Sequence, residues 1–204
     1  ATDPEIVART AVAMQADIVA LPETTLDTGT SAARAMKEMG SPMWVHDEEF
    51  PGWDANWTTI LVSPDLGDYA VVSSDVNGTS NTSTVPSVVI RPVDHDGPTI
   101  VAAHAIAPRV DDMDAWRQDL RWLADQCGTD NVIMAGDFNA TVDHMAHLGV
   151  DGATMGRCVD AAVNTGSGAI ATWPTSMMSL IGAPIDHVMA TPEWTPTGTA
   201  VLGS

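Results

Sequence analysis

Residues 131–140 read Asn-Val-Ile-Met-Ala-Gly-Asp-Phe-Asn-Ala, an apolar run that changes abruptly at Gly136-Asp137-Phe138-Asn139. A short apolar run bounded by turn-forming residues is typical of a strand buried inside a protein. Loops and strand ends are where catalytic side chains are often held by a rigid scaffold. The stretch therefore predicts a buried strand at 131–135, with Asp137 and Asn139 presented just beyond it. Asp137 and Asn139 could also simply cap the turn or helix that follows.

Three other apolar runs carry polar residues at their ends. Glu23 follows the run 17–21 and its stop at Pro22, His104 closes the run 98–104, and Asp186 with His187 lies in the run 184–190. If these strands share one sheet edge, the polar groups converge. Each also has a simpler interpretation: Glu23 as a solvated loop acid, His104 as a core histidine, and His187 as a packing residue or a support for Asp186.

The rest of the chain alternates between helical and extended patterns. Apolar residues at helical spacing predict helices at 3–16, 29–39 and 112–127 and a short one at 141–148, whereas Val- and Thr-rich runs predict strands at 57–63, 68–73 and 85–93. We see no linker that would divide residues 1–204. This pattern predicts a single layered α/β domain, with loops at 41–56 and 150–183 that set substrate choice.

The residue types at the strand ends suit phosphoryl chemistry. Magnesium prefers hard oxygen ligands and usually binds through one or two carboxylates, so Glu23 could anchor the ion. Asp137 could orient or deprotonate a water, Asn139 and His104 could donate to phosphate oxygens, and Asp186 could fix an imidazole. By contrast, Asp143, His144 and His147 are expected on an exposed helical face. The sequence thus predicts a Mg²⁺- or Mn²⁺-dependent site that hydrolyses a phosphate ester.

Charge limits the substrates. The chain has 27 acidic and 8 basic residues, a formal net charge of -19, and nonspecific binding to nucleic acid depends on Lys and Arg. We therefore expect a small-molecule or lipid-linked phosphate ester as the substrate rather than duplex DNA. Separately, we expect the protein to be a monomer. A nuclease with a local basic groove of Arg91, Arg109 and Arg157 is the alternative, and a non-catalytic surface binding module is the alternative of another class.

The two cysteines leave a question open. Cys127 and Cys158 are too few for a disulfide scaffold and lack zinc-type spacing, so buried free thiols are the simplest interpretation. In an extracytoplasmic protein they could pair instead. No run of 18 apolar residues and no signal peptide is present in the sequence, so no membrane span is expected within it.

The motifs together resemble the endonuclease/exonuclease/phosphatase superfamily. The segments that carry the resemblance are ADIVALPE at 16–23, AAHAIAP at 102–108, AGDFNAT at 135–141 and APIDHV at 183–188, in the family's order. The resemblance implies a DNase-like four-layer sandwich of two mixed sheets flanked by helices. It also implies a metal ion at Glu23 and catalytic roles for His104, Asp137, Asn139, Asp186 and His187. ATWP at 171–174 looks most like secreted or membrane-anchored bacterial members, so we expect an extracytoplasmic location.

The resemblance is incomplete at both ends. The family usually begins with a strand that ends in Asn and finishes with a Ser-Asp-His strand, and neither motif is found in residues 1–204. We therefore expect a fold without its first and last strands, part of the metal site missing, and activity lower than that of a chain with both strands.

Overall fold

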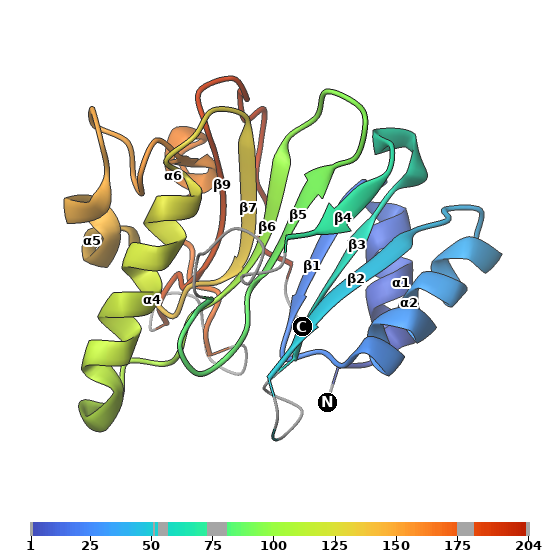
Figure 1. Ribbon diagram of the computed structural model, residues 1–204, viewed down its shortest axis with the longest axis horizontal. Coiled ribbons are helices and arrows are strands. Elements are labelled where there is room, and N and C mark those ends of the chain that lie inside the picture. Colours follow the sequence, from blue (N-terminus) through green and yellow to red (C-terminus); the bar gives the residue numbers. More distant parts are fainter. Residues whose placement is uncertain (1, 51, 53–56, 73–80, 175–181, 203–204) are drawn as a thin grey trace.

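The computed structural model describes residues 2–50, 52, 57–72, 81–174 and 182–202. Within these ranges two β-sheets face each other and helices cover the outer side of each, which gives the four layers in Figure 1. The smaller sheet has the strand order β1-β3-β2, and the larger has the order β4-β5-β6-β7-β9-β8. The predicted four-layer α/β sandwich is confirmed.

The smaller sheet is antiparallel and comprises β1 (Ile18–Pro22), β2 (Trp44–Glu49) and β3 (Trp57–Val62). Helices α1 (Pro4–Ala13) and α2 (Leu26–Glu38) pack on its outer face. The carboxylate of Asp3 accepts hydrogen bonds from the backbone N–H groups of Glu5 and Ile6, so it caps α1 close to the predicted start of the helix at residue 3. Thr25 caps α2 in the same way, and the helix begins at Leu26, three residues before its predicted start.

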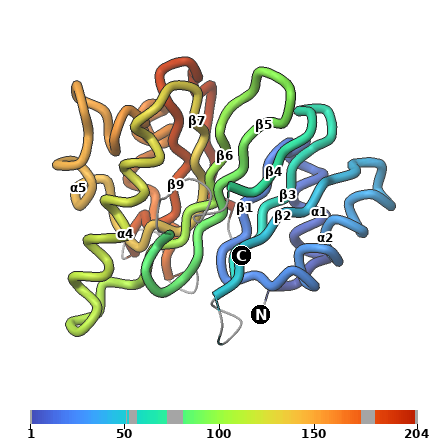
Figure 2. The backbone as a smooth tube through the Cα atoms, in the orientation of Figure 1, coloured from blue at the N-terminus to red at the C-terminus, as the bar shows by residue number. Residues whose placement is uncertain are grey.

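The larger sheet contains β4 (Tyr69–Val71), β5 (Val88–Pro92), β6 (Thr99–His104), β7 (Val132–Asp137), β8 (Val159–Asp160) and β9 (Asp186–Ala190). Only β6 and β7 are parallel neighbours among these strands, and α4 (Met113–Gln126) connects them across the outer face. Figure 2 traces the chain through the smaller sheet before it enters the larger one. Short helices complete the chain: η2 (Pro64–Leu66), η3 (Val110–Asp112), α5 (Val142–Met145), η4 (Ala146–Leu148) and α6 (Ala161–Asn164).

Buried apolar side chains lie on both faces of the larger sheet. Ile100 and Ala102 of β6 pack toward Ile60 and Val62 of the smaller sheet, whereas Val101 and Ala103 pack under α4. Successive residues of a strand point to opposite faces, so each strand of the sheet contributes to two cores. A polar residue at a strand end therefore belongs to one face or the other according to its parity.

Two regions differ from the sequence-based expectation. The segment 41–56, expected to be a loop, contains β2. This strand was not predicted because its residues 46–49 are all polar, so it lacks the alternation of apolar and polar residues typical of a strand. The segment 150–183 contains β8 and α6, which were not predicted. In the described part of the chain α1 is the first element and β9 the last strand. All helices of that part are too short or too polar to cross a membrane.

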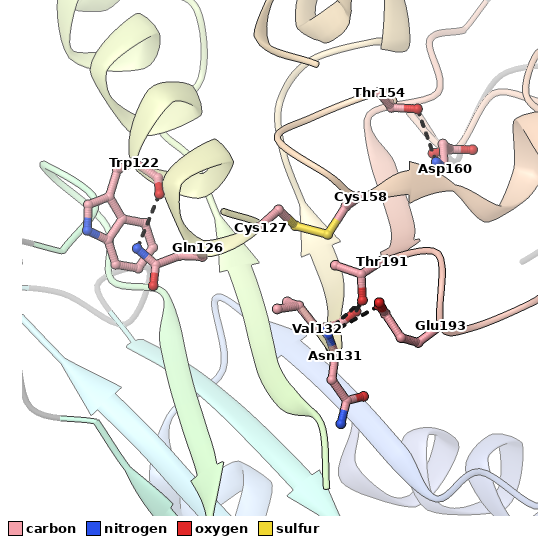
Figure 3. Close-up of a disulfide and its surroundings, with 10 residues drawn as sticks. All are labelled: Trp122, Gln126, Cys127, Asn131, Val132, Thr154, Cys158, Asp160, Thr191 and Glu193. Atoms are coloured by element: carbon pink, nitrogen blue, oxygen red, sulfur yellow. Dashed lines mark hydrogen bonds between the residues drawn. A yellow bond between two sulfur atoms is a disulfide. The ribbon is translucent and has the colours of Figure 1, made fainter. Parts of the chain in front are cut away.

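A disulfide joins Cys127, at the end of α4, to Cys158, directly before β8 (Figure 3). Both side chains are fully buried, and their Cα atoms are 5.6 Å apart. The interpretation of the two residues as free thiols is therefore wrong. The bridge spans 31 residues of sequence, and these include β7 with Asp137 and Asn139.

Candidate active site

Three neighbouring strands bring His104, Asp137 and Asp186 into one row. His104 of β6 is in register with Asp137 of β7, and Asp137 is in register with Asp186 of β9. Residues in register share a face, and the contact between His104 and Thr58 of β3 shows that this is the face toward the smaller sheet. We call this side of the larger sheet the inner face, and the side under α4 the outer face. The predicted convergence of these strand ends is observed.

Glu23 approaches this row from the smaller sheet. It lies just beyond β1, and its Oε1 atom is 3.9 Å from Nε2 of His104. The carboxylate side chain is 66% exposed, so a ligand can reach it. Glu23 also has a left-handed backbone with φ of 52°, an uncommon conformation for a residue of this kind. Such strained residues are found preferentially at functional sites.

The segment after β7 is held by its own side chains. The backbone N–H of Asn139 donates to Oδ1 of Asp137 at 2.7 Å, and the Asn139 amide donates to the carbonyl oxygen of Ala105 at 2.9 Å and to Oδ2 of Asp137 at 3.3 Å. Asn139 has φ of 46°, which Asn tolerates better than most residues. Thr141 caps helix α5, so Asp137 and Asn139 do not cap that helix, but the bond from the Asn139 N–H to Asp137 does cap the turn after β7, as the simpler interpretation predicts.

Gly136 is required by the close packing of β6 and β7. Its φ is 146°, and a Cβ atom at this position would lie 2.1 Å from the carbonyl oxygen of Ala103. Any side chain here would push the two strands apart. Each residue of Gly136-Asp137-Phe138-Asn139 thus has its own role. Gly136 allows the close approach of the strands, Asp137 supplies the carboxylate, Phe138 packs in the core, and Asn139 adopts the left-handed turn.

The electrostatic environment of Asp137 is unfavourable for its charge. Burial, followed by repulsion from Asp186 and Glu23, raises the pKa of Asp137 to about 7, although the Asn139 N–H and the charge of His187 act in the opposite direction. In the described ranges no Lys or Arg forms an ion pair with Glu23, Asp137 or Asp186. The inner face therefore presents a group of acidic side chains without a basic partner.

His104 is buried at the centre of this group. Its backbone N–H donates to Oγ of Ser87 at 2.9 Å, and its Nδ1 atom lies 3.3 Å from Oγ1 of Thr58. Burial lowers the pKa of His104 to about 4, so the ring is neutral at pH 7. The side chain is 2% exposed, as the core interpretation predicts, yet its Nε2 atom faces Glu23.

The structure does not bring His187 to this group. His187 follows Asp186 in β9 and therefore points to the outer face, where its ring packs edge-on against Phe138. Its Nδ1 atom is 2.7 Å from Oδ2 of Asp160, and its Nε2 atom is 2.8 Å from the carbonyl oxygen of Ala140. The expected catalytic placement of His187 is thus corrected: it is a buried support for the segment after Asn139.

The Asp160–His187 pair is a closed ion pair. Burial alone would lower the pKa of His187, but the hydrogen bonds with Asp160 and Ala140 raise it above the ordinary value. Burial would likewise raise the pKa of Asp160, but the hydrogen bonds from His187 and the N–H of Val163 lower it. The backbone N–H of Asp160 also donates to Oγ1 of Thr154 at 3.1 Å (Figure 3).

Several residues that shape the site were not predicted from the sequence. Thr58 contacts His104, and Oγ1 of Thr172 accepts hydrogen bonds from the backbone N–H groups of Ile185 and Asp186, both at 3.1 Å. Asp160 belongs to a segment expected to be irregular. These residues contact the site from 14 to 46 positions away in the chain. A single sequence carries no signal for such distant contacts.

The three arginines of the nuclease alternative do not form one groove. Arg91 lies beyond Ile90 in β5, which pairs with Ile100, so it is at the end of the sheet opposite His104. Arg157 pairs with Asp130 at 2.7 Å, just before β7 begins, and Arg109 lies at the start of η3. The predicted basic groove is therefore wrong. Asp143, His144 and His147 are exposed, as predicted.

Comparison with known proteins agrees with this geometry. Residues 3–204 match the Endonuclease/Exonuclease/phosphatase family. The chain belongs to this family. Membership supports a general phosphoesterase or nuclease role for the chain. No match was found among curated proteins.

Solved structures of other proteins share the fold. An endonuclease/exonuclease/phosphatase family protein from Leptotrichia buccalis aligns with a TM-score of 0.62 and 13% identity over 95% of this chain and 82% of that chain. A humanized D. rerio TDP2 aligns with a TM-score of 0.61 and 12% identity over 95% and 79% of the two chains. An endonuclease/exonuclease/phosphatase from Bacteroides vulgatus aligns with a TM-score of 0.57 and 13% identity over 93% of this chain and 78% of that chain. At these identities the likeness establishes the fold alone.

Proposed function

We propose that this protein is a divalent-metal-dependent hydrolase of phosphate mono- or diesters that uses Mg²⁺ or Mn²⁺. The observation that carries the proposal is the convergence of Glu23, Asp137 and Asp186, where burial, then Asp186 and Glu23, raise the pKa of Asp137 to about 7. Carboxylates that lie together at strand ends and have no basic partner are chemically suited to bind a cation. The site residues act together in this proposal.

The donor set fits a magnesium-like ion. Among the described residues no three His, Cys, Asp or Glu side chains converge as a closed metal cage. Magnesium does not require such a cage, because it usually keeps several waters and binds through one or two carboxylates and substrate phosphate. Glu23 is the exposed carboxylate that would hold the ion, with Asp186 the other accessible acid. When bound, the cation would polarise the phosphate and neutralise developing charge.

The residues of the chain divide the remaining work. Asp137 accepts a proton from the attacking water, for which a pKa near 7 is well suited at neutral pH. Asn139 holds Asp137, because its amide hydrogens already donate to Asp137 and Ala105. Thr172 accepts a hydrogen bond from the backbone N–H of Asp186, and the carboxylate of Asp186 adds negative charge that raises the pKa of Asp137. His104 lies buried at the inner side of the site, with its Nε2 atom 3.9 Å from Oε1 of Glu23.

Charge and the disulfide bear on substrate and location. A net charge of -19 and the scattered arginines favour a small-molecule or lipid-linked phosphate ester over duplex DNA. The Cys127–Cys158 disulfide supports an extracytoplasmic location, because disulfides persist in oxidising compartments.

A phosphoester screen tests the proposal. The chain is assayed with a generic phosphomonoester, a generic phosphodiester and duplex DNA, each with Mg²⁺, Mn²⁺ or EDTA. We expect metal-dependent hydrolysis of a small ester, reduced by about 10² to 10⁴ in Asp137→Asn because the proton acceptor is lost. Asp143→Asn, which changes an exposed aspartate of α5, is the matched control and should retain activity.

The other outcomes distinguish the alternatives. Preferential cleavage of DNA that declines steeply with salt would favour the nuclease. Absence of hydrolysis and of calorimetric binding of Mg²⁺ or Mn²⁺ would overturn the proposal in favour of a non-catalytic binding module.

A further inference from the structure

Thr58 connects the two sheets directly behind His104. It is fully buried in β3, and its hydroxyl donates to the carbonyl oxygen of Pro86 at 2.6 Å. The same oxygen lies 3.3 Å from Nδ1 of His104. A threonine hydroxyl has a single proton, and a carbonyl oxygen can only accept. The short contact with Pro86 therefore takes that proton, since two oxygens at this distance without a hydrogen would repel each other.

This proton count determines the role of Nδ1. With its proton committed to Pro86, the Thr58 oxygen can only accept from the His104 ring. Nδ1 must then carry the hydrogen, because two facing lone pairs inside the core would leave both groups unsatisfied. In a neutral imidazole one ring nitrogen is a donor and the other an acceptor. Nε2 is consequently left without a hydrogen.

We propose that Thr58 is a positioning residue that fixes His104 as the Nδ1–H tautomer, so that Nε2 enters the candidate site as a hydrogen-bond acceptor. Nε2 faces Oε1 of Glu23 at 3.9 Å, and an ionised carboxylate is also an acceptor. Two acceptors at this separation can be bridged by one water that donates to both, since each hydrogen bond would span about 2.8 Å.

The tautomer defines what His104 can recognise. An unprotonated Nε2 repels an ionised phosphate oxygen and attracts a water or a protonated leaving-group oxygen. His104 therefore receives a hydrogen bond in the site, rather than donating to phosphate as its residue type alone suggests. This catalytic consequence rests on the proposed phosphoesterase function, whereas the tautomer itself rests only on the contacts of Thr58.

Ring-nitrogen NMR tests the tautomer without substrate. In the ¹⁵N-histidine-labelled chain, long-range ¹H–¹⁵N correlations distinguish protonated from unprotonated ring nitrogens, and His104→Gln identifies the signals of His104. At pH 7 we expect a protonated Nδ1 and an unprotonated Nε2. Thr58→Val should move the population toward Nε2–H, and Thr58→Ser, which restores the hydroxyl, should keep the wild-type pattern.

A second buried hydroxyl provides the control. Thr191 is equally buried and accepts a hydrogen bond from the N–H of Val132 at 2.9 Å, at the opposite end of β7. Thr191→Val should leave the His104 signals unchanged even if it lowers the melting temperature as Thr58→Val does. A wild-type ring that carries its hydrogen on Nε2, or a Thr58→Val ring identical to wild type, would overturn the proposal.

Kinetics then test the consequence for the reaction. Thr58→Val should lower kcat by about 10- to 100-fold with a smaller change in KM, and Thr58→Ser should recover most of it. Equal kcat in Thr58→Val and wild type would overturn the catalytic consequence. If no phosphoester is hydrolysed, the phosphoesterase proposal fails, whereas the NMR result still decides the role of Thr58.

Discussion

The two faces of the larger sheet carry acidic residues in opposite electrostatic settings, at the same end of the sheet. On the outer face, Asp160 is fully buried but receives hydrogen bonds from His187 and Val163. On the inner face, Asp137 receives a hydrogen bond from Asn139 but is repelled by Asp186 and Glu23. Burial raises the pKa of either carboxyl by itself, and the neighbours decide the outcome: the pKa of Asp160 falls and that of Asp137 rises to about 7.

This difference separates a structural polar group from a candidate functional one. A closed pair such as Asp160–His187 satisfies its own charges, so removing one partner destabilises the fold, and the pair leaves nothing for a ligand. An unsatisfied acidic group reduces stability until a cation or proton neutralises it. Perturbed groups of this kind cluster at functional sites, and the inner face fits that rule. The same substitution on the two faces should therefore have opposite effects.

The largest effect is expected on the outer face. Asp160→Asn removes the charge that faces the buried, doubly hydrogen-bonded His187, and breaking a buried pair leaves one group uncompensated. We expect the free energy of unfolding to fall by about 3 kcal/mol. Urea denaturation at pH 7 measures it. The exposed Asp143→Asn is the control and should change stability by less than about 0.5 kcal/mol. Equal effects of the two substitutions would contradict the closed-pair description.

Asp137→Asn should have the opposite sign. It removes a buried charge that two other carboxylates repel, and it keeps an oxygen that can accept from the N–H of Asn139. A pKa of about 7 instead of 3.8 corresponds to an upper value of about 4 kcal/mol, and we expect a gain of about 2 kcal/mol at pH 8.

The pH dependence of this gain is its own check. Because the folded pKa is raised, the carboxyl weakens the fold increasingly from about pH 4 to pH 7, so the gain should vanish near pH 4. Denaturation is measured in EDTA, since a bound cation would also neutralise Asp137. A loss of stability in Asp137→Asn at pH 8 would show that the inner face is not electrostatically unsatisfied.

Local patterns were sufficient to predict the strands that carry the acidic residues of the candidate site. The apolar run before Asp137 and the stop at Pro22 before Glu23 are contiguous in sequence, so periodicity and turn chemistry locate them. The β2 strand was missed because its sequence Trp-Val-His-Asp-Glu-Glu lacks a clear alternation. Its place at the edge of the sheet tolerates charges that a central strand would exclude.

The partners of each polar group could not be predicted in the same way. Asp186 and His187 are adjacent in one strand, so their side chains had to face opposite sides, and this parity was an available signal against a shared site. The identity of the outer-face partner was not available, because Asp160 is 27 residues away from His187. Thr58 and His104 are 46 residues apart, and Cys127 and Cys158 are 31 residues apart.

The smallest effect concerns the proton of His187. Both ring nitrogens face acceptors, and the pKa of His187 is raised in the folded state, so the folded chain holds this proton more tightly than the unfolded chain. The resulting stability is complete below about pH 6.5 and is lost as pH rises through the folded pKa.

In the Asp137→Asn background, which removes the inner-face contribution, the free energy of unfolding should decline above pH 6.5 by at most about 1.4 kcal/mol per pH unit. Urea denaturation from pH 6 to pH 9 measures the slope, and adding His187→Gln should flatten it. His104, whose pKa is lowered to about 4, contributes a slope only below pH 6.5 and so does not interfere. A slope that persists without His187 would assign the pH dependence to another group and remove the contrast between the two faces.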